Sequence, residues 1–156
     1  HSGSRDSHSA AAAGELYDQA LLALETSALR TTAPRRAMLR ALAREHGPFT
    51  IEELHARLPA GTCDLVTVYR SLSTLEAVGI VRRCDFGDGV QRFEMASGGH
   101  HHHHIICRRC HKVRILDAEC VAEPLERIAR EAGYREVGHS LEIFGVCPQC
   151  AGPQAQ

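Results

Sequence analysis

Two cysteine pairs have the spacing of a metal site. Cys107 and Cys110 form one C-x-x-C pair, and Cys147 and Cys150 form the other. Each pair follows an apolar run that we expect to be a β-strand, so two knuckles from neighbouring strands can meet. Closed tetrahedral thiolate sets are what structural zinc prefers, and a redox dithiol or a disulfide is the alternative. We predict one structural zinc at these cysteines.

A run of histidines, His100–His104, leads directly into the first cysteine pair. In an extended segment, alternate side chains point to opposite faces. His101 and His103 then share one face, and His102 and His104 share the other. The run therefore predicts ligands for two different sites, with an affinity tag or a solvated low-complexity segment as the alternatives.

Two residues outside the run are natural additions to these pairs. Glu94, at the end of a predicted strand, is expected to join His102 and His104. His139, in the segment GHSLEIFG, is expected to join His101 and His103.

The composition supports metal ligation inside a reducing compartment. The 156 residues include 7 Cys and 11 His, with 44% hydrophobic residues and a net charge of −1. An odd number of cysteines, mostly in C-x-x-C pairs beside histidines, favours metal binding in the cytoplasm over a secreted disulfide scaffold. No apolar run approaches the ~18 residues of a membrane span, so we expect no membrane association.

The N-terminal half has the element order of a winged helix-turn-helix. Helical spacing of apolar residues predicts helices at 15–29, 34–46, 50–58 and 65–78, the third opened by a Thr50–Glu53 capping box. Two alternating runs, Ile80–Cys84 and Gln91–Met95, flank Gly-Asp-Gly and predict a β-hairpin. Bases in this half are arginines, which suit phosphate and guanine contacts.

The helix at 65–78 has two faces. We expect the apolar face to pack into the core through Leu65, Val68, Leu72 and Leu75. The outward face, with one tyrosine on its flank, is of the kind that contacts bases in a major groove: Thr67, Tyr69, Arg70, Ser71 and Thr74. An ordinary solvated face is the alternative.

The expected organisation is α+β, with a winged helix-turn-helix domain before a small α+β domain. We predict a disordered tail over 1–14, the DNA-binding domain over 15–97, the metal-binding dimerisation domain over 98–151 and a tail over 152–156. The second domain is expected to contain strands at HHIIC and near 112–116, a helix at about 123–132 and a strand within 140–146.

Three segments together resemble the ferric uptake regulator family of metal-dependent repressors. They are HHHHHIICRRCHKV, GHSLEIFGVCPQC and TVYRSLSTLEAVGIVRR, and the resemblance covers roughly residues 15–151. It implies a cytoplasmic homodimer that is not an enzyme and binds palindromic operator DNA. It also implies that a metal at the hinge sets the angle between the DNA-binding domains.

The resemblance assigns ligands position by position. The paired cysteines match the structural zinc ligands. One set matches the interdomain regulatory site: Glu94, His102 and His104. Another matches a further site in the dimerisation domain, where a histidine replaces a frequent aspartate: His101, His103 and His139. Tyr69 and Arg70 fall in the DNA-reading helix.

Three departures from the family pattern affect these sites. A histidine frequent before the second helix of the DNA-binding motif is Pro48 here, which leaves His46 as a candidate ligand. A usual glutamate is Ala122 here, so Cys120, or less favourably Glu119 or Glu123, is the candidate replacement. Cys84, on the first wing strand, is a further candidate for the regulatory site, and a buried structural cysteine is the alternative for Cys84 and Cys120.

Histidine-rich ligand sets with an available thiolate suit zinc better than iron or manganese. We therefore favour a zinc-sensing repressor, with Fe²⁺ or Mn²⁺ sensing next. A peroxide sensor is disfavoured, because Glu94 is the one evident carboxylate of a regulatory set. A zinc hydrolase lacks an H-E-x-x-H arrangement, and a zinc buffer would not need the N-terminal half.

Overall fold

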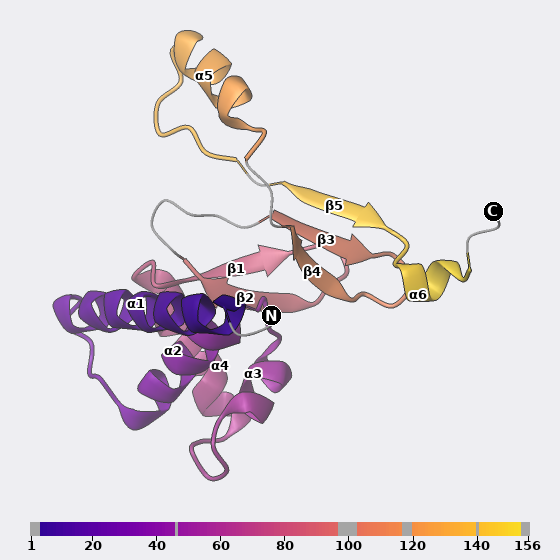
Figure 1. The fold of residues 1–156 in the computed structure, drawn as a ribbon. Helices are drawn as coiled ribbons and strands as arrows, with labels where there is room; N and C mark the ends of the chain where they lie inside the picture. The colour runs from indigo at the N-terminus through magenta and orange to yellow at the C-terminus, as the bar shows by residue number, and fades with distance from the viewer. Residues whose placement is uncertain (1–3, 46, 97–102, 117–119, 140, 154–156) are drawn as a thin grey trace. The chain divides into compact units, whose positions relative to one another are not determined.

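The computed structural model describes residues 4–45, 47–96, 103–116, 120–139 and 141–153 (Figure 1). Side chains are described from residue 11 onward. The chain divides into two compact units, residues 1–99 and 100–156.

The described residues of the first unit form four helices and a hairpin (Figure 1). The elements are α1 (Ser4–Thr26), α2 (Ala33–Glu45), α3 (Ile51–Arg57), α4 (Leu65–Ala77), β1 (Val81–Asp85) and β2 (Gln91–Met95). The predicted capping box is present at α3, where Thr50 Oγ1 accepts from Glu53 N at 3.1 Å and Glu53 Oε2 accepts from Thr50 N at 3.0 Å. Asp64 caps α4 by accepting from Thr67 N at 2.8 Å.

The core of the first unit lies where the helices meet the hairpin. Its buried members include Leu24, Met38, Leu42 and Leu72, with Phe93 from β2. β1 and β2 pair antiparallel, and a single bridge joins Phe49 to Phe93, so the hairpin is tied to the helix-turn-helix. The predicted winged helix-turn-helix is confirmed.

Helix α1 corrects one prediction. It begins at Ser4 and so extends through most of the 1–14 segment that the sequence predicted to be a disordered tail. The reason lies in Ala10–Ala13, a run of the strongest helix former, which continues directly into the periodic segment that follows. Gly14 lies inside this helix and does not break it.

Helix α4 corrects the expected faces at both edges. Ser71 was predicted to point outward, but only 7% of its surface is exposed. It lies three residues after Val68 and four before Leu75, which are both fully buried, and this spacing brings it onto the packed face. Leu65 was predicted to be in the core but is 43% exposed, because it begins the helix ahead of the first packed turn.

The second unit is built on a three-stranded sheet. Its elements are β3 (His103–Cys107), β4 (Val113–Leu116), α5 (Glu123–Glu131), β5 (Glu142–Gly145) and α6 (Pro148–Ala151) (Figure 1). The strand order is β4-β3-β5, with β3 antiparallel to β4 and parallel to β5. The predicted elements are all present.

The apolar stripe of α5 faces outward. Val121, Leu125 and Ile128 are all more than half exposed, and none of the residues of α5 is buried. Within the described part of this single chain, nothing covers the stripe.

Within the described residues, no helix is both long enough and apolar enough to span a membrane.

Candidate metal centres

The four-cysteine cluster is assembled at the ends of two parallel strands. Cys107 ends β3, and Cys110 lies in the turn that leads into β4. Cys147 is the N-cap of α6 and Cys150 lies within that helix, directly after β5. Because β3 and β5 are parallel, with Cys107 opposite Gly145, both pairs emerge at the same edge of the sheet.

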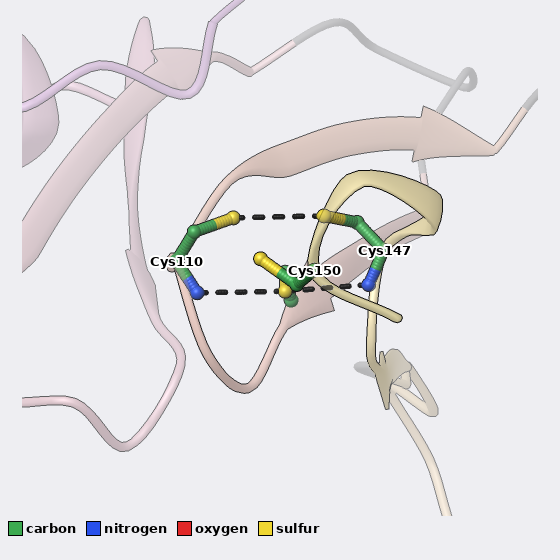
Figure 2. A group of neighbouring side chains, drawn as sticks. Cys110, Cys147 and Cys150 are labelled. Carbon is green, nitrogen blue, oxygen red and sulfur yellow. Dashed lines mark hydrogen bonds between the residues drawn. The ribbon is translucent and has the colours of Figure 1, made fainter. Parts of the chain in front are cut away.

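The spacing of the sulfurs fits a tetrahedral metal site. The four Sγ atoms lie within 4.8 Å of one another, and those of Cys110 and Cys147 are 3.7 Å apart (Figure 2). A tetrahedron with Zn–S bonds of about 2.3 Å requires sulfurs roughly 3.8 Å apart. A disulfide requires about 2 Å, and none joins any of the seven cysteines, all of which are described. The predicted cluster could therefore hold zinc.

The backbone prepares Cys107 to be a thiolate. Its Sγ accepts hydrogen bonds from the N–H groups of Cys110 at 3.5 Å and Cys147 at 3.3 Å. These bonds lower the pKa of the Cys107 thiol to about 5. Hydrogen bonds with the thiols of Cys147 and Cys110, together with the nearby Cys107, raise the pKa of Cys150 to about 12. A bound cation favours the thiolate form of every ligand, which offsets this difference.

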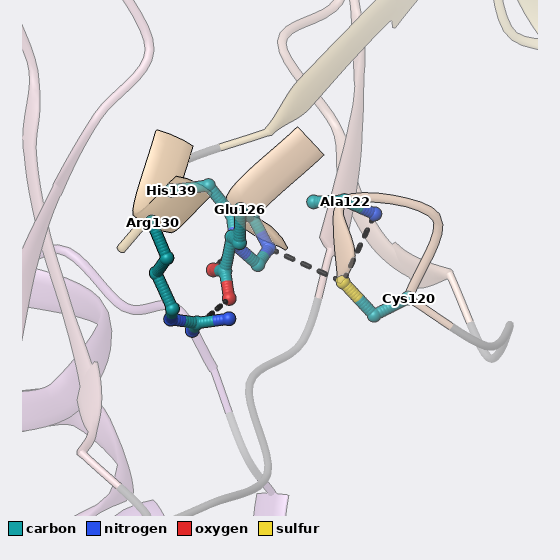
Figure 3. A network of polar contacts seen from close by, with 5 residues as sticks. All are labelled: Cys120, Ala122, Glu126, Arg130 and His139. Atoms are coloured by element: carbon teal, nitrogen blue, oxygen red, sulfur yellow. Dashed lines mark hydrogen bonds and ion pairs between the residues drawn. The ribbon is translucent and has the colours of Figure 1, made fainter. Parts of the chain in front are cut away.

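A second cluster contains one residue from β3, one that precedes α5 and one that follows α5. The ligand atoms of His103, Cys120 and His139 lie within 4.8 Å of one another. Cys120 Sγ is 3.3 Å from His139 Nε2 (Figure 3), and the rings of His103 and His139 are 5.6 Å apart between centroids. Of the four residues predicted for this site, the structure brings these three together, and His101 lies outside the described residues.

One residue bonded to this cluster was not predicted. Glu126, on α5, accepts a hydrogen bond from His139 Nδ1 at 2.5 Å and pairs with Arg130 at 3.0 Å. The bond with His139 lowers the pKa of Glu126, and the Arg130 guanidinium acts in the same direction against desolvation. The sequence pointed only to the acids that flank Ala122, and Glu126 lies four residues further along. Its partner, His139, lies beyond the end of α5, so no local pattern links the two residues.

The predicted interdomain set is divided between the two units. Glu94, on β2, is opposite Arg82 across the hairpin and accepts from Arg82 Nε at 2.6 Å. Cys84 lies diagonally from Glu94 on the same face of the hairpin, since its cross-strand neighbour is Arg92.

The remaining members of that set belong to the second unit or lie outside the description. His104, on β3, is flanked by Ile115 on β4 and Glu142 on β5. His46 and His102 lie outside the described residues.

Four of the five predicted DNA-contacting residues reach the surface of α4. Tyr69 and Arg70 are exposed, while Thr67 and Thr74 are half-buried. Thr74 donates its hydroxyl proton to the carbonyl of Arg70 at 2.9 Å. Ser71 is buried and does not belong to this surface.

Known proteins share this arrangement over most of the chain. The ferric uptake regulator family profile matches residues 26–144. A ferric uptake regulation protein from Legionella pneumophila is 36% identical over 130 residues, covering 81% of this chain and 95% of that protein. The chain belongs to the ferric uptake regulator family.

Two further matches are regulators whose names refer to different signals. A peroxide-responsive repressor from Staphylococcus aureus is 30% identical over 136 residues, covering 85% of this chain and 90% of that protein. The crystal structure of the Vibrio cholerae ferric uptake regulator has a TM-score of 0.65 at 30% identity, covering 81% of this chain and 98% of that one. The chain is thus a metal-responsive regulator of this family, and these relatives do not fix its metal.

Proposed function

We propose that the protein is a zinc-sensing transcriptional repressor of the ferric uptake regulator family, acting in the cytoplasm as a homodimer on palindromic operators. The donor set of the second cluster carries this proposal. Two imidazoles and a thiol converge there, with Cys120 Sγ 3.3 Å from His139 Nε2. Such a set suits zinc, whereas iron and manganese favour more oxygen ligands.

Recognition of DNA is assigned to helix α4. Arg70 supplies a guanidinium that can bind guanine or phosphate in bidentate fashion, and Tyr69 and Thr67 supply hydroxyl groups. The hairpin at the end of α4 serves as the wing. Arg82 and Arg83 on β1 are paired with Glu94 and Glu76, whereas Arg70 is exposed on α4.

Pairing of two copies is assigned to the second unit. Its described surface exposes large apolar side chains that a monomer would leave in water: Val121, Leu125, Ile128, Tyr134, Ile143 and Phe144. Two-fold symmetry then presents two α4 helices to the two halves of a palindrome.

Metal sensing is assigned to both histidine-containing sets. The interdomain set of Glu94, His102 and His104, with Cys84 or His46 as a fourth ligand, controls DNA binding. Metal bridging the two units would favour one arrangement of the DNA-binding units. Moving a mostly inactive dimer to a mostly active one requires about 5 kcal/mol of differential binding. Bonds to a transition-metal ion can supply that difference. The position of Cys84 on the same hairpin face as Glu94 supports its inclusion.

The deciding experiment is a metal-by-metal DNA-binding titration on protein of known metal content. A DNA sequence is first selected from a random pool in the presence of Zn²⁺, and again with Mn²⁺ and with Fe²⁺ under anaerobic conditions. For each metal, the free concentration that activates DNA binding is compared with the level of that metal available in the cell. We expect this ratio to be lowest for Zn²⁺. Replacement of His104 by Ala should abolish the metal dependence while the dimer stays folded.

Sensing of iron, manganese or peroxide is the alternative within the family. It is favoured by Glu94, a hard oxygen ligand, and by the relatives named above. Activation by Fe²⁺ or Mn²⁺ but not Zn²⁺ would establish it. Absence of metal-dependent DNA binding with every metal would instead favour a zinc buffer or a zinc hydrolase.

A further inference from the structure

The Glu126 carboxylate lies between the second cluster and the rest of helix α5. Its Oε1 accepts from His139 Nδ1 at 2.5 Å, and its Oε2 accepts from Arg130 at 3.0 Å (Figure 3). Each oxygen therefore has its own partner. Arg130 lies one helical turn further along α5, so the pair fixes the rotamer of Glu126 on the helix surface.

This contact decides which nitrogen of His139 is available to a metal. With Nδ1 donating its hydrogen to Glu126, Nε2 carries the lone pair. That nitrogen is the one directed at Cys120 Sγ, 3.3 Å away. Carboxylates commonly fix the tautomer and orientation of metal-binding histidines in this manner.

The same network holds the first turn of α5 at a second point. Ala122 is the N-cap residue of α5 and offers no side chain to cap it. Its N–H group is instead bonded to Cys120 Sγ at 3.4 Å (Figure 3). The Ala122 N–H group thus links the beginning of α5 to Cys120, and Glu126 links it to His139.

Packing contributes little to the placement of this helix. None of the residues of α5 is buried, although Leu125 and Ile128 form an apolar stripe along it. A helix of nine residues is marginal by itself and depends on its contacts to persist. Within the described part of a single chain, this polar network therefore holds the start of α5, whereas packing does not.

We propose that Glu126 is a positioning residue that couples metal occupancy of the His103–Cys120–His139 site to the placement of helix α5. Metal bound by Cys120 and His139 fixes both anchors of the helix at once. The apolar stripe of α5 is then presented in a single orientation. This inference rests on the second metal site assigned under the proposed function.

Metal affinity tests the positioning role. Protein with zinc in its four-cysteine site is titrated with Co²⁺, and the thiolate-to-cobalt absorption that disappears in Cys120→Ser reports the second site. We expect Glu126→Ala to weaken this binding by about 10–100-fold. Glu126→Gln, whose carbonyl can still accept from His139 Nδ1, should weaken it much less. Glu131→Ala, on the same helix outside the network, is the matched control.

Amide hydrogen exchange tests the coupling. Saturating Co²⁺ should slow exchange across 123–131 in the parent and in Glu131→Ala. In Glu126→Ala the slowing should be largely lost even when the site is filled. Equal protection in Glu126→Ala and the parent at saturation would overturn the coupling.

The outcomes separate this inference from the site on which it rests. If Cys120→Ser and His139→Ala leave Co²⁺ absorption and affinity unchanged, the second metal site itself is wrong. If those two variants lose the site while Glu126→Ala binds Co²⁺ as tightly as Glu131→Ala, the site stands and the role of Glu126 is wrong.

Discussion

Backbone geometry gives the four cysteines of the structural cluster unequal chemistry. Cys107 is buried and accepts two N–H groups, one from each knuckle. The sulfurs of Cys110 and Cys147 lie 3.7 Å apart, and hydrogen bonds with neighbouring thiols raise the pKa of Cys150. The spacing of the cysteines predicted the ligand set. It could not show that the sulfur of Cys107 accepts backbone hydrogen bonds from both turns.

The ionisation of Cys107 gives a testable pH dependence. Because its pKa is lowered from 9.0 to about 5 in the folded protein, the folded state releases this proton first. Its contribution to stability is complete above pH 9.0 and is lost as the pH falls through about 5. In metal-free, reduced protein, ultraviolet thiolate absorbance should show a step near pH 5 that is missing in Cys107→Ser.

Circular dichroism recorded in parallel provides the control for that titration, since it shows whether the protein stays folded. A folded protein whose first thiolate appears only near pH 9 would contradict the prediction.

In the second cluster, three predicted residues can be compared with their positions in the structure. Alternation along the histidine run predicted that His101 and His103 share a face, and His139 was a separate predicted addition. The ligand atoms of His103 and His139 lie within 4.8 Å of each other. Cys120 was one of several candidates, and its sulfur lies within 4.8 Å of the ligand atoms of His103 and His139. Glu126 could not be found from local pattern, because its contact with His139 depends on how the chain returns after α5.

At the scale of elements, caps and turn residues determine the helix-turn-helix. The Thr50–Glu53 capping box and the spacing of apolar residues predicted α3 and α4 to within a residue or two. Prediction failed at Ser71, where a short hydroxyl side chain is tolerated on the packed face. Polarity alone is a weaker guide to burial than the position of a residue relative to its neighbours on the helix.

The capping box should contribute measurably to the first unit. Replacing Thr50 by Ala removes the acceptor for Glu53 N and should lower the free energy of unfolding by about 0.5–2 kcal/mol. Chemical denaturation followed by circular dichroism measures the change. Glu53→Gln keeps a capping side chain and should cost less, so equal losses in the two variants would argue against the capping explanation.

A substitution on helix α4 should affect specific DNA binding more than non-specific DNA binding. Replacing Arg70 by Ala should weaken binding to the selected palindrome by about 1–3 kcal/mol if the guanidinium reads a base. Binding to random DNA should change much less. A uniform loss on both DNAs, with a shallower salt dependence, would show that Arg70 contacts phosphate instead.

Ser71→Ala serves as the matched variant on the same helix. Its side chain is buried, so it should leave the preference for the palindrome unchanged. A loss of sequence preference in this variant would mean that the inner edge of α4 takes part in recognition.

At the scale of the whole molecule, the outward stripe on α5 bears on assembly. Leu125 is 68% exposed in the single chain, and its neighbours Val121 and Ile128 are exposed as well. Replacing Leu125 by Asp should shift the protein from dimer to monomer in sedimentation, because a charge would be buried at the interface. Leu22→Asp is the matched control, since Leu22 is 61% exposed on α1 of the first unit. A dimer that tolerates Leu125→Asp as well as Leu22→Asp would exclude α5 from the interface.

The parallel pairing of β3 with β5 has a consequence for synthesis of the chain on the ribosome. Parallel neighbours need a crossover, and here α5 and its flanking segments provide it. A nascent chain that has emerged only as far as β4 carries Cys107 and Cys110 without the other two ligands. Until Cys150 follows, this pair is a reactive dithiol, open to oxidation or to capture of the wrong metal. The topology therefore leaves the first cysteine pair exposed to these reactions during translation of the segment between the two pairs.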